Sequence, residues 1–225
     1  MEITPNDLKN NILFLKSLSG FNVTNPYKTE IIKYLDEIDH TAQICESVNT
    51  VVNINGKLKG YNTDIAGFTE SMKFHQIPMD SKVCIIGFGG VAKAILYKLL
   101  SFGSDLTIAI RNYSKDRVIK ITQFISDKFD IKRVNIINLD KINGEYDLLI
   151  NATPIGCFPN SNELLIKDSS ILRNVQHIFD LIYNPSITRL MKMGIENGCN
   201  VFNGEYMLLW QAIESQKLWL DKEKI

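Results

Sequence analysis

The sequence has no excess of charge of either sign and no apolar run long enough to cross a membrane. Its 25 lysines and arginines balance 25 aspartates and glutamates, so charge gives no argument for binding nucleic acid or an anionic membrane. The longest apolar runs are far shorter than the roughly 20 residues of a membrane helix. The opening Met-Glu-Ile-Thr-Pro lacks the basic and apolar regions of a secretory signal. We expect a soluble protein with no nucleic-acid or membrane partner.

Cysteine is also scarce and shows no metal-binding spacing. The four cysteines stand far apart, without a CxxC pair, which predicts neither a zinc site nor a disulfide framework. No metal is therefore expected, and the reducing cytoplasm is the expected location. At 225 residues the chain is long enough to bury one large core or two modest ones.

The first third of the sequence mixes helical and strand patterns. Asn25 is a candidate N-cap for a helix that has Pro26 in its first turn. Asn55-Gly56 lies between two alternating runs and is the strongest short signal for a hairpin. The expected elements are helix 7–18, strand 20–24, helix 25–38, strands 48–54 and 57–62, and helix 65–75, followed by a linker at 79–81.

Strand and helix patterns alternate through the rest of the chain and end in one long helix. This alternation predicts an α/β fold with a doubly wound parallel sheet of the Rossmann type. A smaller α/β substrate domain is expected at 1–78, the nucleotide-binding domain at 79–203, and a C-terminal helix at 204–225 that returns to the substrate domain. The expected strands are 82–87, 105–110, 134–138, 147–152, 177–182 and 199–203, and the expected helices are 90–102, 114–128, 186–197 and 205–222.

A glycine-rich turn joins the first strand of the predicted Rossmann domain to the following helix. In Gly87-Phe88-Gly89-Gly90-Val91, the first glycine permits a tight turn and the second lets backbone N–H groups approach a pyrophosphate at the helix N-terminus. A plain strand–turn–helix that needs glycine for its geometry is the alternative.

The end of the next predicted strand favours NADP(H) over NAD(H). An NAD site places Asp or Glu there to bind the ribose 2′-hydroxyl, whereas this chain has Arg111, Asn112 and Lys115. Two cations suit a 2′-phosphate. The alternative is that both are solvated cations at the start of a helix.

Lys28 and Asp64 are candidates for a proton-transfer pair. Lys28 falls in the first turn of the expected helix, where the helix dipole disfavours the ammonium form. Counting back from the hairpin turn places Asn49 opposite Asn62, with Asp64 as a diagonal neighbour, so these three side chains are expected to line a polar pocket. Alternatively, Lys28 is a solvated lysine and Asp64 caps the next helix. A proton-transfer pair beside a dinucleotide turn indicates a carbonyl-reducing dehydrogenase.

At these residues the chain resembles the shikimate dehydrogenase family. Asn22-Val-Thr-Asn-Pro-Tyr-Lys28 is similar to the family pattern NVTxPxK, and Gly60-Tyr-Asn-Thr-Asp64 to GxNTD. Cys157 stands where the family's NATPxGM motif has methionine. The matching segments are 22–28, 47–50, 60–68, 87–91, 151–157, 180–185 and 207–212, and they extend over most of the sequence.

The resemblance implies NADPH-dependent reduction of 3-dehydroshikimate to shikimate in aromatic amino-acid synthesis. It implies that Lys28, helped by Asp64, transfers the hydroxyl proton. It further implies substrate contacts from Thr24, Lys28, Asn49, Asp64, Tyr183 and Gln211, and cofactor contacts from Gly87, Phe88, Gly89, Gly90, Val91, Arg111, Asn112, Lys115, Asn151, Thr153, Leu181 and Gly204.

The sequence departs from the family pattern at two places. Lys115 stands where the family has an arginine, and a lysine binds phosphate as a point charge only, so cofactor affinity is expected to be weaker. Family members also open with a strand, a Ser-x-Ser loop for the substrate carboxylate, a helix and a second strand. This sequence resembles them from the end of that second strand, near Ile3-Thr4, and Ser17 and Ser19 end a helix instead.

The second departure predicts an N-terminally incomplete substrate domain that binds NADPH but turns over 3-dehydroshikimate poorly. A start site set too far downstream, a fragment, or a non-catalytic NADP-binding paralogue would each explain it. A quinate/shikimate dehydrogenase, with broader substrates and possible use of NAD, is a further alternative. Monomer and homodimer are both compatible with the sequence.

Overall fold

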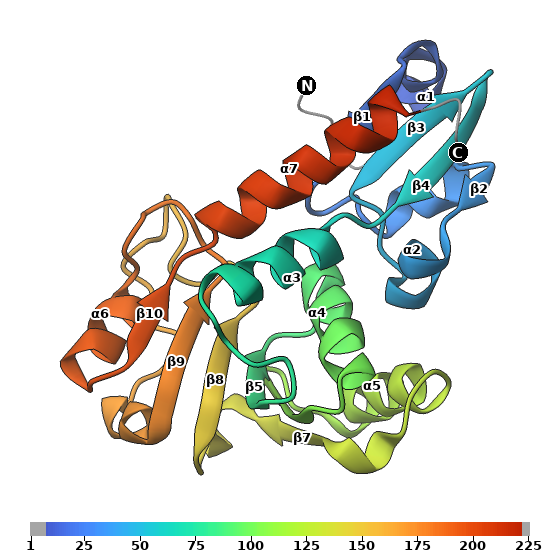
Figure 1. The fold of residues 1–225 in the computed structure, drawn as a ribbon. Coiled ribbons are helices and arrows are strands. Elements are labelled where there is room, and N and C mark those ends of the chain that lie inside the picture. Colours follow the sequence, from blue (N-terminus) through green and yellow to red (C-terminus); the bar gives the residue numbers. More distant parts are fainter. Residues whose placement is uncertain (1–7, 222–225) are drawn as a thin grey trace.

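The computed structural model describes residues 8–221 of the chain. The expectations for Ile3-Thr4, for the first residue of helix 7–18 and for the end of the C-terminal helix lie outside the described residues. Two sheets form the framework, one for each predicted α/β part (Figure 1). The boundaries at residues 78 and 203 stay a prediction.

The larger sheet has six parallel strands in the order β10-β9-β8-β5-β6-β7. The order reverses direction at β5, as in the doubly wound dinucleotide-binding folds, whose ligands bind where the order reverses. The predicted α/β class and parallel sheet are confirmed. The strands are β5 (Lys82–Ile86), β6 (Asp105–Ile110), β7 (Val134–Asn138), β8 (Tyr146–Asn151), β9 (Val175–Asp180) and β10 (Asn200–Phe202).

Both faces of this sheet are covered by other elements. Alternate residues of a strand point to opposite faces, so each strand contributes side chains to two cores. In β5, Val83 and Ile85 join one core, and Cys84 and Ile86 join the other. Helices cover one face and a helix with a 3₁₀ turn covers the other (Figure 1). The covering elements are α3 (Asp64–Phe74), α4 (Gly90–Ser101) and α5 (Lys115–Ser126) on the first face, and α6 (Arg189–Glu196) and η4 (Ser169–Asn174) on the second.

The smaller sheet has four strands in the order β1-β3-β4-β2. The hairpin has the predicted register, with Ile54 opposite Lys57 across Asn55-Gly56, and β1 lies at one edge of the sheet. Its core is filled from β3, β4 and the helices beside them. The elements are α1 (Leu8–Ser17), β1 (Gly20–Asn22), β2 (Glu37–Ile38), α2 (His40–Cys45), β3 (Thr50–Ile54) and β4 (Lys57–Tyr61).

The predicted helix over 25–38 is wrong. This stretch forms turns and one 3₁₀ helix, η1 (Glu30–Tyr34), followed by β2. The carbonyl of Lys28 accepts a hydrogen bond from the Val48 N–H at 2.8 Å, and the Ile32 N–H, its i+4 partner in an α-helix, donates to the Thr29 carbonyl at 3.4 Å instead. The argument that a helix dipole acts on Lys28 therefore does not apply. The short helix α2 was not predicted.

Glu46, directly after α2, joins the two parts of the molecule through ion pairs. Its carboxylate accepts hydrogen bonds from Lys93 on α4 at 2.6 Å and from Lys128 after α5 at 3.0 Å. Partial burial disfavours the charged carboxylate, but these two hydrogen bonds hold the pKa of Glu46 below its usual value. These contacts fix the segment after Lys28 against the helix that follows the glycine-rich turn.

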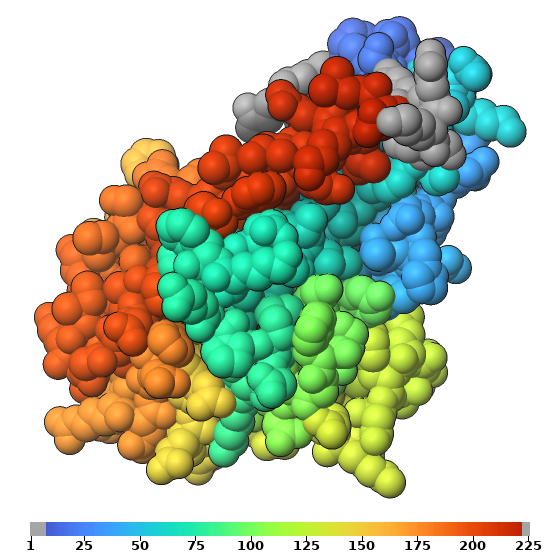
Figure 2. Space-filling view, in the orientation of Figure 1, coloured from blue at the N-terminus to red at the C-terminus, as the bar shows by residue number. Residues whose placement is uncertain are grey.

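The last helix, α7 (Glu205–Leu220), runs from the large sheet to the small one. Figure 2 shows it beside α3 along one face of the molecule. Its buried residues are Met207 and Ser215, whereas Leu208 and Ala212 are exposed. The Trp219 indole N–H donates to the Val51 carbonyl at 3.0 Å, which ties the end of α7 to β3.

Candidate active site

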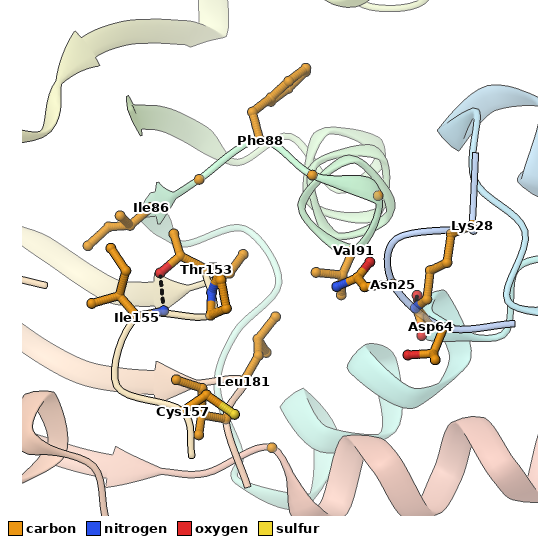
Figure 3. A pocket seen from close by; sticks show the side chains of 18 of the residues that line it. Asn25, Lys28, Asp64, Ile86, Phe88, Val91, Thr153, Ile155, Cys157 and Leu181 are labelled. Carbon is orange, nitrogen blue, oxygen red and sulfur yellow. Dashed lines mark hydrogen bonds and ion pairs between the residues drawn. The ribbon is translucent and has the colours of Figure 1, made fainter. Parts of the chain in front are cut away.

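One cavity of about 890 Å³ lies between the two sheets. It extends from Lys28 and Asp64 on one side to the glycine-rich turn after β5 and the loop after β8 on the other (Figure 3). The two sides come from segments far apart in the sequence. The cavity therefore brings the candidate proton-transfer pair and the candidate nucleotide turn into one space.

Lys28 and Asp64 form a largely buried ion pair. The Lys28 Nζ lies 2.7 Å from Asp64 Oδ2, and the side chains are 16% and 7% exposed. Asp64 is the first residue of α3, and Thr63 before it forms no side-chain cap. A charge-assisted hydrogen bond of this length holds the ammonium group in one position at the cavity wall.

Asn49 orients the second carboxylate oxygen of this pair. The Asn49 Oδ1 accepts hydrogen bonds from the N–H of Thr63 at 2.8 Å and from its hydroxyl at 3.1 Å. Because both partners donate, this atom is the amide oxygen and the Nδ2 faces Asp64 Oδ1 at 2.8 Å. Asn49 thus donates to one oxygen of Asp64 while Lys28 donates to the other.

Asn62, predicted on the same wall, lies behind it. Its side chain is buried, donates to the Ser47 carbonyl at 2.9 Å and accepts from the Asp64 N–H at 3.1 Å. It supports the turn into α3 and is not among the residues that line the cavity.

The glycine-rich turn and the start of α4 form another part of the wall, where Gly90 lies beside the segment that carries Lys28. Gly87 has a positive φ of 102°, and an added Cβ would lie 2.9 Å from Thr153 Cγ2, so the turn itself requires glycine there. Gly89 precedes α4 in extended conformation, and no atom lies within 4 Å of its would-be Cβ. The first turn of a helix also leaves backbone N–H groups without intrahelical partners. Figure 3 shows Phe88 pointing away from Asp64.

Cations gather at the end of the cavity beyond this turn. Arg111, Asn112 and Arg117 line it, whereas Lys115 does not. Lys115 and Arg117 are two positions apart at the start of α5, so they project from opposite sides of the helix. Together with Lys28 the lining has three cations, and Asp64 is its one carboxylate within residues 8–221. This imbalance suits an anionic ligand.

Asn151, predicted to contact a cofactor, is fully buried outside the cavity lining. Its Nδ2 donates to Asp180 Oδ1 at 2.9 Å, and its Oδ1 accepts from the Thr153 N–H at 3.0 Å. Burial raises the pKa of Asp180 to about 6, against hydrogen bonds from Thr188, Ile182 and Asn151 that lower it. Asn151 therefore couples the ends of β8 and β9 and orders the loop that carries Thr153.

The other predicted site residues lie along the cavity. These are Thr24, Tyr183, Gln211, Gly87, Phe88, Gly89, Gly90, Val91, Thr153, Leu181 and Gly204. Asn22, Asn25, Arg117 and Cys157 are among the further lining residues that were not predicted for the site. The motif Asn22–Lys28, which contains the first two, was a signal for them, but nothing in the sequence indicated which face of α5 meets the cavity.

The lining also constrains the chemistry of the site. Within residues 8–221 the lining contains no serine, and no cluster of His, Cys, Asp and Glu there has the composition of a metal site. Within the described part of the chain, no helix is long and apolar enough to span a membrane. What the cavity offers is one lysine–aspartate pair facing amide side chains, and a glycine-rich helix start beside two arginines. This arrangement can exchange a proton with one ligand while holding an anionic second ligand.

Comparison with known proteins gives one consistent family. Residues 1–51 match the family model described as "Shikimate dehydrogenase substrate binding domain". A shikimate dehydrogenase (NADP(+)) of Dehalococcoides mccartyi strain CBDB1 is 37% identical over 224 residues, which cover 97% of this chain and 78% of the relative.

Solved structures agree in fold as well as in sequence. A shikimate dehydrogenase crystallised in complex with NADP+ has a TM-score of 0.88 and 35% identity, over 97% of this chain and 77% of that one. The shikimate 5-dehydrogenase of Thermus thermophilus, in complex with NADP(H) and shikimate, has a TM-score of 0.83 and 27% identity, over 96% and 78%. The chain belongs to the shikimate dehydrogenase family.

Proposed function

We propose that the protein catalyses the reversible, NADPH-dependent reduction of 3-dehydroshikimate to shikimate. The observation that carries this proposal is the single cavity in which the Lys28–Asp64 pair faces the glycine-rich turn. The names of the relatives supply the substrate and the cofactor. A cytoplasmic location and a role in aromatic amino-acid synthesis belong to the same proposal.

The lining fits NADP(H). The open space at Gly89 lets a pyrophosphate approach the first turn of α4, and Arg111 and Arg117 suit a 2′-phosphate. Leu181, Thr153 and Gly204 also line the cavity. When bound, NADPH supplies the hydride that reduces the ketone.

Lys28 is the proposed proton donor. As hydride reaches the ketone carbon, negative charge develops on its oxygen, and the Lys28 ammonium gives that oxygen a proton. Asp64 and Asn49 hold the ammonium at the cavity wall, and the neutral amine then recovers a proton from water. Thr24, Tyr183 and Gln211 are the proposed partners of the substrate hydroxyls. Proton transfer of this kind contributes about 10²–10⁴-fold to rate.

The direct test is the oxidation of shikimate by the purified chain with NADP+, followed by absorbance of the reduced cofactor. We expect shikimate-dependent reduction of NADP+, with a higher kcat/KM than with NAD+. Quinate is the comparison substrate, because a quinate/shikimate dehydrogenase would oxidise both. Binding of NADP+ without any turnover would contradict the proposal and favour a non-catalytic NADP-binding protein.

Arg117 is expected to contribute to the preference for NADP+ more than Lys115 does. Arg117→Ala removes a cation that lines the cavity, whereas Lys115→Ala removes one that projects elsewhere. Loss of one charge-assisted phosphate contact corresponds to about 10–100-fold in the ratio of kcat/KM for NADP+ over NAD+. The two variants, assayed side by side, give the comparison. A larger effect from Lys115→Ala would instead support the assignment made from the family pattern.

Cys157 is expected to be the cysteine that reacts with iodoacetamide in the folded protein. It is partly exposed and lines the cavity, whereas Cys45, Cys84 and Cys199 are buried. Burial raises the pKa of Cys45 and of Cys84 to about 12 and also raises that of Cys199, which suppresses the reactive thiolate. Mass spectrometry should locate the label at Cys157, and saturating NADP+ should slow labelling. Labelling that is unaffected by NADP+ would separate Cys157 from the cofactor.

A further inference from the structure

A buried hydroxyl on α7 lies at the centre of a hydrogen-bond network behind the site. Ser215 is fully buried. Its Oγ lies 2.7 Å from Thr50 Oγ1, 3.1 Å from Asn22 Nδ2 and 3.2 Å from Thr63 Oγ1, and it donates to the Gln211 carbonyl at 2.9 Å. These partners come from β1, β3, the turn before α3 and α7 itself. One side chain therefore joins four segments that meet at the cavity.

Counting protons assigns the direction of each bond. Ser215 uses its one proton on the Gln211 carbonyl, so its oxygen is an acceptor for the Thr50 hydroxyl and the Asn22 amide. Thr63 donates its hydroxyl to Asn49 Oδ1 at 3.1 Å. The Thr50 hydroxyl lies 3.1 Å from the same oxygen but 2.7 Å from Ser215, and the shorter contact takes its proton.

Through these hydroxyls the network reaches the proton-transfer pair. Thr63 holds Asn49 Oδ1, which turns Asn49 Nδ2 toward Asp64 Oδ1 at 2.8 Å. Asp64 presents its other oxygen to Lys28 at 2.7 Å. Without an acceptor at Ser215, the Thr50 hydroxyl would turn to Asn49 Oδ1 and compete with Thr63. Competition for Asn49 Oδ1 would then shift the amide that donates to Asp64 Oδ1.

The same face of α7 also carries a side chain of the site itself. Gln211, Ser215 and Trp219 are spaced by four residues, so they lie along one side of the helix. Gln211 Oε1 lies 3.4 Å from Asn49 Nδ2 and lines the cavity, and Trp219 binds the Val51 carbonyl. Ser215 is the middle anchor, one turn from Gln211.

We propose that Ser215 is a positioning residue for the Lys28–Asp64 pair, acting through Thr50, Thr63 and the amide of Asn49. This inference rests on the proposed function for its catalytic readout. It does not require Ser215 to touch either ligand, since Ser215 does not line the cavity.

The matched control is Ser71→Ala. Ser71 is also a fully buried helix serine whose hydroxyl donates to the i−4 carbonyl, that of Gly67 at 2.9 Å, but it has no part in the network. Ser215→Ala is expected to lower kcat by about tenfold, since a lost hydrogen bond of 1–1.5 kcal/mol corresponds to that factor. The KM for NADP+ should stay within about twofold, because the substitution removes no contact that binds NADP+ equally in the ground state and in the transition state. Ser71→Ala should change neither constant.

A second readout does not depend on turnover. In ¹H–¹⁵N NMR spectra, the Asn49 side-chain amide, identified by its loss in Asn49→Ala, should shift in Ser215→Ala and stay in place in Ser71→Ala. Ser215→Cys, which keeps a weak acceptor at the same position, should lie between wild type and Ser215→Ala in kcat, and serves if the alanine variant does not fold. Equal effects of Ser215→Ala and Ser71→Ala on kcat and on the Asn49 signals would overturn the inference. If wild type fails to reduce NADP+ with shikimate, the proposed function fails, and the Asn49 signals still decide the role of Ser215.

Discussion

Replacing Lys28 with alanine is expected to abolish turnover while leaving NADPH binding nearly intact. Proton transfer accounts for about 10²–10⁴-fold in rate, and Lys28 is the one lysine that lines the cavity within the described residues. The glycine-rich turn and the arginines that we assign to the cofactor line the same cavity but belong to other segments of the chain. The measurements are kcat for shikimate oxidation and NADPH affinity by fluorescence titration.

Lys28→Arg separates catalysis from the stability of the buried pair. Alanine leaves Asp64, 7% exposed, without its ionic partner, and removal of one partner of a buried pair destabilises by about 3–5 kcal/mol. Arginine keeps a positive charge for Asp64 but does not give up a proton at neutral pH. We therefore expect Lys28→Arg to fold with a Tm near that of wild type and still to lose at least about 100-fold in kcat.

Lys33→Ala is the control for both Lys28 variants. Lys33 lies on the same segment but pairs with Glu30 at the surface, with 67% of its side chain exposed, and such pairs contribute little to stability. It should leave kcat unchanged. If Lys28→Arg retained activity within a few-fold of wild type, proton donation by Lys28 would be excluded.

The sequence predicted that Asn49 and Asp64 lie together because a hairpin transmits register. A two-residue turn at Asn55-Gly56 fixes which residues face each other along both strands, so Asn49 and Asp64 could be placed together by counting. The observed pairing of Ile54 with Lys57 has this register. Alternation of strands and helices likewise predicted the parallel sheet, because each strand–helix unit is a local pattern.

Features that depend on contacts between distant segments could not be predicted in this way. Periodicity indicated a helix after Asn25, but the Lys28 carbonyl pairs with the Val48 N–H, twenty residues further along the chain, and not with the i+4 N–H of a helix. The face of α5 that meets the cavity depends on how the helix packs, and so Arg117 was missed. Ser215 was missed for the same reason, since its partners come from three segments outside α7.

Gly89→Ala is expected to weaken NADPH binding while leaving the ligand-free protein at least as stable as wild type. Gly89 has φ −98° and ψ −171°, a conformation open to alanine, and no atom lies within 4 Å of the added Cβ. Substitution of glycine by alanine at a compatible position stabilises by about 0.4–1 kcal/mol, because it reduces the entropy of the unfolded chain. The fold therefore gives no reason for glycine at this position.

A ligand does give such a reason, because a Cβ at Gly89 would stand where a pyrophosphate must approach the first turn of α4. Losing charge-assisted hydrogen bonds to the phosphates should raise the Kd for NADPH by about 10–100-fold. Gly87→Ala is the contrasting variant: its positive φ and the contact with Thr153 predict a lower Tm as well as weaker binding. Thermal unfolding with and without NADPH measures both effects in each variant. Unchanged NADPH affinity in Gly89→Ala would mean that the pyrophosphate does not lie at this helix, and the cofactor would have to be placed elsewhere in the cavity.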